Sequence, residues 1–151
     1  MKRAGFTMIE LIFVIVILGI LAAVAIPKLA ATRDDAKIAK DASEVSTAVQ
    51  DFASYYTAQG EFGTVGKMTN VKFVTTQDGT TDAVNTDMNG SNTIYYNDST
   101  GKSCLHFTVT ATDGNLTITS DTNGTTECKG LNAATADLQK THQFGGSGVK
   151  W

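Results

Sequence analysis

The sequence is poor in proline, cysteine and histidine, and these shortages limit the chemistry that the chain can perform. Its 151 residues include one proline, two cysteines and two histidines. His106 and His142 stand alone, without the neighbouring acid or thiol that a metal site or a nucleophile–base pair requires. No grouping of Ser, His and Asp and no glycine-rich phosphate loop can be recognised. We therefore expect a protein that is not an enzyme.

Positive charge is also scarce. The chain has 12 Lys and Arg against 15 Asp and Glu, a formal net charge of -3, and its only basic run is Lys2-Arg3. Proteins that bind nucleic acid need clustered cations to neutralise phosphates. Nucleic acid is therefore not an expected partner.

Apolar residues are plentiful overall, at 42%, but they are unevenly distributed. Many of them lie between Phe6 and Ile26, whereas Thr, Asn, Asp, Gly and Ser dominate from Thr64 onward. So polar a segment forms short strands and turns with only a thin core of its own. It needs another element to pack against.

The N-terminal apolar run is long enough to cross a membrane. Leu11 to Ile26 is apolar without interruption and would span about 24 Å as a helix. Adding residues 6–9 gives about 31 Å, close to the ~30 Å core of a bilayer. The preceding Lys2-Arg3 pair would stay on the cytoplasmic side.

Glu10 is the anomaly within this run. A carboxylate inside a membrane helix costs about 2.5–3.5 kcal/mol on insertion scales, so its presence indicates a function and a partner. The only positive charge at this depth would be a new α-amino group, created by cleavage after Gly5. A neighbouring subunit, shifted along the helix axis, would present that amine in a suitable geometry.

The run Gly5-Phe6-Thr7-Met8-Ile9-Glu10, followed by the apolar helix, resembles the class III signal of type IV pilins and type II secretion pseudopilins. The resemblance implies that prepilin peptidase, a membrane aspartyl peptidase, cuts after Gly5 and N-methylates Phe6. It further implies that Phe6, Thr7 and Glu10 act in assembly, with Glu10 binding the terminal amine of an adjacent subunit.

The resemblance extends to Gly19 and Pro27, which occupy positions where the family weakens the helix. Glycine disfavours helix and proline removes a backbone donor, so the segment between them could unwind during packing. The implied partners are identical or homologous pilin subunits, prepilin peptidase, and an inner-membrane platform with its assembly ATPase. The implied location is the bacterial inner membrane, with a single span and the C-terminal domain outside, and then a periplasmic or extracellular filament.

Several alternatives remain open at this point. An ordinary secretory signal could end at Ala23-Val24-Ala25, and the run could also be a simple uncleaved anchor. Both leave Glu10 without a role. The chain could instead be a low-copy minor pilin that binds DNA or a surface at a filament tip, or an exported binding protein. Within the family, the sequence does not separate a pilus subunit from a secretion pseudopilin.

After Pro27 the helical pattern becomes amphipathic. Apolar residues spaced by four and three, which place them on one helix face, are Ile38, Ala42, Val45, Val49, Phe52 and Tyr56. Lys37, Lys40, Asp41, Glu44 and Asp51 are expected on other faces. Gly60 is a suitable end, so residues 6–59 predict one helix about 80 Å long.

We expect three to four antiparallel strands on this helix, at Thr93–Asn97, Cys104–Thr112 and Asn115–Ser120, with another short strand at Val71–Thr75. The fold class is then α+β, a long N-terminal helix packed on a small antiparallel sheet. Its parts are a leader (1–5), an apolar helix (6–27), an amphipathic helix (28–60) and a β-rich head (61–151).

Turn residues predict how the strands connect. A two-residue turn at Asp113-Gly114 would place Ala111 opposite Leu116 and Val109 opposite Ile118. A further turn at Asn123-Gly124 would return Glu127-Cys128 toward the sheet. A short helix is expected at Ala133–Lys140, followed by a loose end around Gly145, Gly146 and Gly148.

Cys104 and Cys128 predict a disulfide. No His/Cys cluster gives them a metal or catalytic role, and downstream of an export signal oxidation is the simpler outcome. The closed loop would contribute about 3 kcal/mol in the chain-entropy model.

Two further patterns are weaker. Asn85, Asp87, Asn89 and Gly90 resemble the start of a calcium loop, but Tyr96 occupies the place of the closing glutamate, so we expect a turn-rich loop and no cofactor, with calcium as the alternative. Asn97, Asn115 and Asn123 begin N-x-Ser/Thr sequons, which chance explains in so Thr- and Asn-rich a segment.

Overall fold

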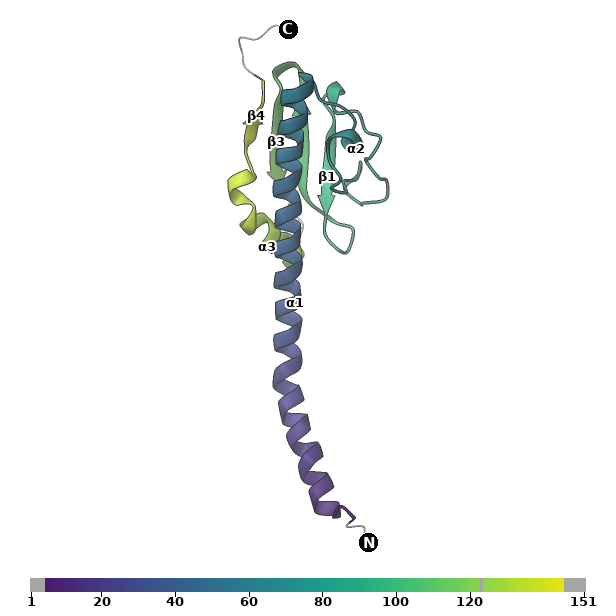
Figure 1. Cartoon of the computed structure of the whole chain (residues 1–151), viewed down its shortest axis with the longest axis vertical. Helices are drawn as coiled ribbons and strands as arrows, with labels where there is room; N and C mark the ends of the chain where they lie inside the picture. The colour runs from purple at the N-terminus through teal and green to yellow at the C-terminus, as the bar shows by residue number, and fades with distance from the viewer. Residues whose placement is uncertain (1–4, 123, 146–151) are drawn as a thin grey trace. The chain divides into compact units, whose positions relative to one another are not determined.

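The computed structural model describes residues 5–122 and 124–145. The chain divides into two compact units, residues 1–36 and 37–151. Its elements follow in the order α1, α2, η1, β1, β2, η2, β3, α3, η3 and β4 (Figure 1). The predicted α+β class, with a long helix packed on a small antiparallel sheet, is confirmed.

Helix α1 runs from Met8 to Gln59 and contains 52 residues. It starts two residues later than predicted, because Thr7 forms the cap that precedes it. Gly60 follows the last helical residue; its φ of 78° lies in the left-handed region and its N–H donates to the Tyr56 carbonyl at 2.8 Å. Glycine tolerates this conformation without strain, so it is a suitable residue to end the helix.

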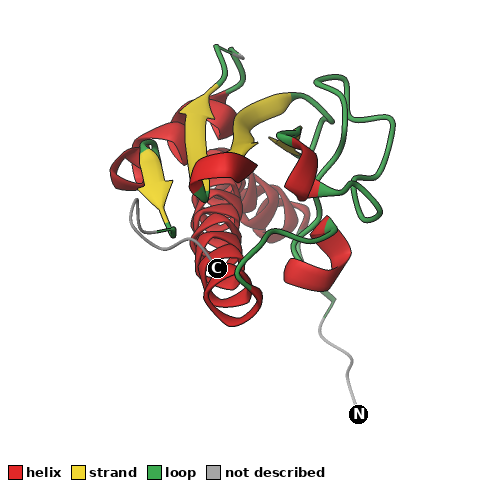
Figure 2. Ribbon diagram, turned by 90° about the horizontal axis from the view of Figure 1, so that it is seen from above, coloured by secondary structure: helices red, strands yellow, loops and turns green. Residues whose placement is uncertain are grey.

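The sheet consists of β1 (Thr93–Asn97), β2 (Ser103–Thr110), β3 (Asn115–Ser120) and β4 (Thr141–Gln143). All neighbours pair antiparallel in the order β1-β2-β3-β4. Buried side chains between residues 37 and 59 of α1 pack on one face of these strands. Figure 2 shows the long helix end-on beside the strands. The predicted bounds of β1 and β3 are confirmed, and β2 ends two residues earlier than expected.

The predicted register of the β2–β3 hairpin was wrong by two residues. Val109 pairs with Leu116 and Phe107 with Ile118, because the connection has four residues and not two. It consists of the 3-10 turn η2 (Ala111–Asp113) and Gly114, whose φ is 62°. A shift of two preserves the side-chain alternation, so the apolar residues still face α1.

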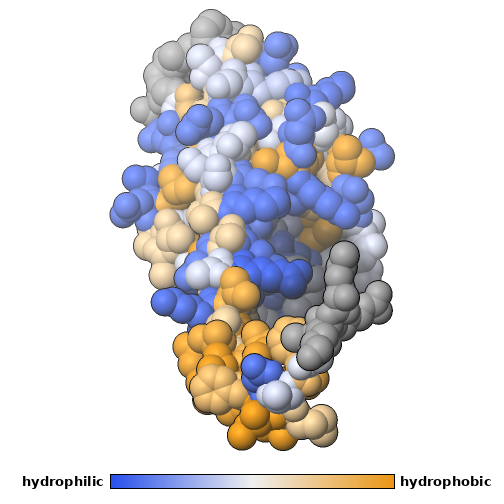
Figure 3. Space-filling view, turned by 60° about the horizontal axis from the view of Figure 1, so that its bottom comes forward, coloured by the Kyte–Doolittle hydropathy of each residue, from blue (hydrophilic) through white to orange (hydrophobic). Residues whose placement is uncertain are grey.

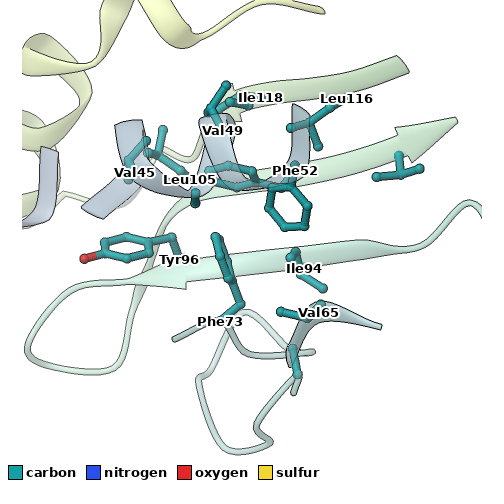
Figure 4. Close-up of a cluster of buried hydrophobic side chains, with 14 of the residues drawn as sticks. Val45, Val49, Phe52, Val65, Phe73, Ile94, Tyr96, Leu105, Leu116 and Ile118 are labelled. Atoms are coloured by element: carbon teal, nitrogen blue, oxygen red, sulfur yellow. The ribbon is translucent and has the colours of Figure 1, made fainter. Parts of the chain in front are cut away.

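The core lies between α1 and the sheet, as the helical spacing predicted. Val45, Val49 and Phe52 from α1 meet side chains of all three long strands (Figure 4). Their partners there include Ile94, Tyr96, Leu105, Phe107, Leu116 and Ile118, all at most 5% exposed. The Phe73 ring completes the cluster, with its centroid 6.0 Å from that of Phe52 and 4.9 Å from that of Phe107.

The connection from residue 60 to 92 contains the short helix α2 (Val65–Met68) and the 3-10 turn η1 (Met88–Gly90). The strand predicted at Val71–Thr75 does not form. Val74 alone makes isolated bridges, to Asp82 and to Tyr95. The buried side chains of Phe73 and Val74 account for the apolar pattern, since a single buried pair does not require a full strand.

After β3 the chain forms α3 (Thr126–Ala134), η3 (Ala136–Leu138) and then β4. The helix predicted at Ala133–Lys140 was therefore placed too late. Thr125 caps α3 by accepting a hydrogen bond from the Cys128 N–H at 3.1 Å. Two of the glycines expected in a loose end, Gly146 and Gly148, lie outside the described residues. Asn123 of the predicted turn at Asn123-Gly124 also lies outside them.

A disulfide joins Cys104 of β2 to Cys128 of α3, with the two Cα atoms 4.9 Å apart. Cys128 thus returns to the sheet from a helix and not from a strand. Both residues are fully buried. The bond fixes α3 against the sheet.

Asp41 departs from the predicted pattern because it is buried, only 9% exposed, although we expected it on a polar face. The Tyr96 hydroxyl lies 3.1 Å from Asp41 Oδ1 and 2.8 Å from Glu44 Oε2. A hydroxyl has one hydrogen, so it donates to one carboxylate at a time. Burial raises the pKa of Asp41 above its ordinary value. Burial also acts on Glu44, but bonds from Lys40 and Tyr96 hold its pKa below the ordinary value.

Removing the disulfide should destabilise the head. The double variant C104S/C128S should lose about 3 kcal/mol of unfolding free energy, because its unfolded chain is no longer constrained by a loop closed over 24 positions. Urea denaturation of the full chain in detergent micelles, followed by near-UV circular dichroism, measures the loss. Dithiothreitol should lower the wild-type midpoint and leave the variant unaffected. Equal midpoints for wild type and variant would contradict a structural role for the bond.

Asp41 and Glu44 should affect stability with opposite sign. When an acid has a higher pKa in the folded than in the unfolded chain, the protein becomes less stable as pH rises from the unfolded to the folded pKa. When the folded pKa is the lower of the two, the protein becomes more stable as pH rises through that interval. Asp41→Asn should therefore raise stability at pH 7, and Glu44→Gln should lower it. Both differences should shrink as the pH falls below the ordinary carboxyl range, near 4. Thermal unfolding at pH 7 and at acidic pH tests this, and two variants that change stability in the same direction at pH 7 would refute it.

Candidate functional site

The start of α1 is the first candidate site, and its geometry is a capping box. The backbone N–H and the hydroxyl of Thr7 donate to Glu10 Oε2 at 2.8 and 2.7 Å. The Glu10 N–H donates in return to Thr7 Oγ1 at 3.4 Å. A threonine cap and a glutamate three residues later thus satisfy each other's backbone donors, as in the T-x-x-E pattern.

This capping box leaves part of the Glu10 carboxylate available. Both hydrogen bonds to the side chain go to Oε2, and Oε1 has no partner among the described residues. An ionised carboxylate accepts about four hydrogen bonds, so two at one oxygen do not saturate it. In an apolar environment the remaining charge favours a further cationic partner.

The helix around Glu10 exposes an apolar surface. Along its first turns the large apolar side chains are 41% to 87% exposed, from Phe6 to Leu29 (Figure 3). Length and composition would allow this part of α1 to cross a membrane, and none of the apolar window is buried within the chain. So continuous a surface requires cover from lipid or from other helices.

The other predicted sites in this segment have defined positions. Gly5 and Phe6 precede the helix, and both are exposed. Gly19 and Pro27 lie inside α1, which is helical at both. Whether the helix unwinds between them during packing stays a prediction. The basic pair Lys2-Arg3 falls outside the described residues.

The head contains a cleft of about 560 Å³ lined by residues of opposite charge. Its lining includes three lysines, Lys37, Lys40 and Lys72, and four acids, Asp41, Glu44, Asp98 and Glu127. Most of these charges already have partners: Lys40 contacts Glu44 at 2.6 Å, and Glu127 accepts from the Ser99 N–H at 3.0 Å. Most of the charges in the cleft are therefore engaged within the chain, and the cleft favours no particular ligand.

The calcium candidates are engaged with the protein itself. Asp87 caps η1 by accepting from the Asn89 N–H at 2.9 Å, and the Asn89 amide donates to Glu61 at 3.2 Å. Asn85 is exposed, whereas Tyr96 is directed into the core. This is the geometry of a turn-rich loop, and calcium binding there stays an untested alternative.

The histidines and cysteines do not meet in the described residues. His106 Nδ1 lies 2.9 Å from Asp121 Oδ1, and His142 Nε2 lies 2.9 Å from the Leu138 carbonyl. Asp98 lies beside the cysteines, but their sulfurs are bonded to each other and are not thiolates. Of the sequons, Asn97 and Asn115 occupy half-buried strand ends.

Sequence reasoning missed the capping box and the buried acid. The spacing Thr7-x-x-Glu10 before an apolar run is itself an N-terminal helix signature, so the sequence contained it. Asp41 could be recognised by its spacing of four to Val45, which continues the buried helix face.

Comparison with known proteins bears on the N-terminus alone. Residues 1–26 match the family described as the prokaryotic N-terminal methylation motif. No curated protein and no solved structure gives a significant match. The match covers Gly5, Phe6, Thr7 and Glu10, and it supports an exported protein of the type IV pilin or pseudopilin kind. The first 26 residues therefore carry the class III signal of type IV pilins and pseudopilins.

Proposed function

We propose that this chain is a structural subunit of a type IV pilus-like filament, of the pilus or the type II secretion pseudopilus class. Prepilin peptidase would cut between Gly5 and Phe6 and methylate the new amine. An inner-membrane platform and its ATPase would then move subunits from the membrane into the filament.

The observation that carries this proposal is the combination of an exposed apolar helix with a partly satisfied acid. Glu10 Oε2 is held by Thr7, while Oε1 has no partner among the described residues. The surrounding side chains are apolar and exposed. A neighbouring subunit could cover this surface and supply a terminal amine to Glu10. A lipid-embedded anchor has no comparable use for the charge.

The capping box offers Glu10 a second role, which the experiment must separate from pairing. A glutamine at this position can still bond to the Thr7 backbone, since capping boxes accept Glu or Gln. It cannot provide the charge that an amine would pair with. The capping role and the charge of Glu10 can thus be tested separately by substitutions at this one residue.

Processing is the first test. Intact-mass and N-terminal peptide mass spectrometry on protein from its native membrane should find a chain that begins at N-methylated Phe6. The variant Gly5→Val, which places a branched side chain at the cleavage site, should retain the leader. A chain that begins at Ile26 would identify an ordinary exported protein and remove the basis for assembly.

Glu10 is the second test. Glu10→Gln and Glu10→Val should both be inserted and processed at the wild-type level, and both should fail to form filaments, because neither can pair with an amine. Counting filaments by electron microscopy, with processing checked by mass, measures the effect. Normal filaments from Glu10→Gln alone would assign the residue to capping, and normal filaments from Glu10→Val would exclude both roles.

A further inference from the structure

The face of the sheet turned away from α1 is an ordered array of hydroxyl groups. Alternate side chains of the four strands point to this face, and six of them are threonines. We call them the threonine face: Thr93, Tyr95, Asn97, His106, Thr108, Thr110, Asn115, Thr117, Thr119, Thr141 and Gln143. The strand register aligns four of the threonines in one row across the whole sheet.

This central row is Thr93, Thr108, Thr117 and Thr141. The hydroxyls of Thr93 and Thr108 lie 3.0 Å apart, and those of Thr117 and Thr141 lie 2.9 Å apart. Each such pair uses one of its two hydroxyl hydrogens and leaves the other, with several lone pairs, for an outside partner. The row therefore presents two hydrogen-bonded pairs of hydroxyls, each with a donor and acceptors left for a ligand.

Beside this row the face carries two rings. Tyr95 and His106 lie on neighbouring strands with ring centroids 6.2 Å apart. Both are half-buried, and the Tyr95 hydroxyl has no hydrogen-bond partner among the described residues. A ring face next to hydroxyls suits a ligand with both C–H and O–H groups.

The threonine face is also uncharged. None of its eleven side chains is Lys, Arg, Asp or Glu, in a chain that has 27 such residues. One acid, Asp121, lies 2.9 Å from His106 of this face, and its carboxylate is bonded to that ring and to the Ser103 hydroxyl. A charged polymer, such as nucleic acid or an acidic glycan, would find no counter-charge here. Electrostatic complementarity therefore favours a neutral partner.

The size of the face argues against a second copy of the chain. Three inter-strand gaps of ~4.8 Å and two steps of ~6.7 Å along a strand give roughly 300 Å² with the bordering side chains. A stable protein–protein interface buries about 800 Å² on each partner. The face is too small for that, but it is large enough for a few sugar units.

We propose that the threonine face binds a neutral polysaccharide, with hydroxyls hydrogen-bonded along the threonine row and a sugar ring against Tyr95. This proposal does not depend on filament assembly, because the ligand contacts only one sheet of one chain.

The test uses the full chain in a polyoxyethylene detergent, which has no sugar head group to compete. Co-sedimentation with cellulose, chitin and cross-linked dextran, all neutral, measures binding, and carboxymethyl cellulose is the charged counterpart. The wild type should bind at least one neutral polymer. Binding should persist in about 1 M salt, where the Debye length is ~3 Å and ionic attraction is screened.

The variant T108V/T117V removes two central hydroxyls and keeps the shape and strand preference of the side chains. It should bind about tenfold more weakly, because each lost hydroxyl removes hydrogen bonds to the ligand. Thr57→Val, on the exposed side of α1, is the matched control and should bind as the wild type does. If circular dichroism finds T108V/T117V unfolded, Tyr95→Ser provides the same test.

Three results would overturn the proposal. They are no binding to any of the neutral polymers, equal binding by wild type and T108V/T117V, and binding that salt abolishes. Light scattering, which measures the mass of the particle, distinguishes binding of a polysaccharide from self-association through the threonine face. A wild type that dimerises, when T108V/T117V does not, would assign the face to self-association.

Discussion

The structure of the head depends on one constraint, which is that the apolar face of α1 must be buried away from water. Val45, Val49 and Phe52 lie on one face of the helix and would be exposed to water without the sheet. The polar sequence after residue 64 has too few apolar residues to form a core without them. Helix and sheet therefore fold as one unit: the helix supplies one side of the core, and strand residues such as Ile94, Leu105 and Phe107 supply the opposite side. The disulfide and the Thr125 cap secure α3, which extends this arrangement at one edge.

The same constraint has a different solution in residues 6–29. The described part of the chain does not cover their apolar side chains, so lipid or other helices must do so. The helix thus contains two segments whose apolar surfaces are covered in different ways. The segment with a single apolar face packs on the sheet of the same chain, and the segment that is apolar on all sides requires cover from outside the chain.

Much of this could be predicted from the sequence, for physical reasons. β1 and β3 have clear alternation, and their bounds are confirmed because each alternating residue faces a continuous core. The hairpin register was wrong because Asp113-Gly114 closes a 3-10 turn of greater length than the two-residue turn that this dipeptide favours in isolation. β4 has only three residues, and its existence depends on pairing with β3, so no local pattern could reveal it. The spacing of four to Val45 places Asp41 on the buried helix face. Its hydrogen-bond partner, the hydroxyl of Tyr96, lies 55 positions away, and no local spacing encodes that contact.

The capping box has one more consequence, which concerns the backbone before it. Because Thr7 fixes the first helical residue at Met8, residues 5–7 are not helical and their peptide bonds are exposed. Proteases act on chain that is accessible and free of helical hydrogen bonds. The cap therefore separates peptide bonds that are accessible to a peptidase from those that are held in the helix. If the helix began a single turn earlier, the bond between Gly5 and Phe6 would lie inside it. Thr7 thus keeps outside the helix the bond at which we propose that the chain is cut.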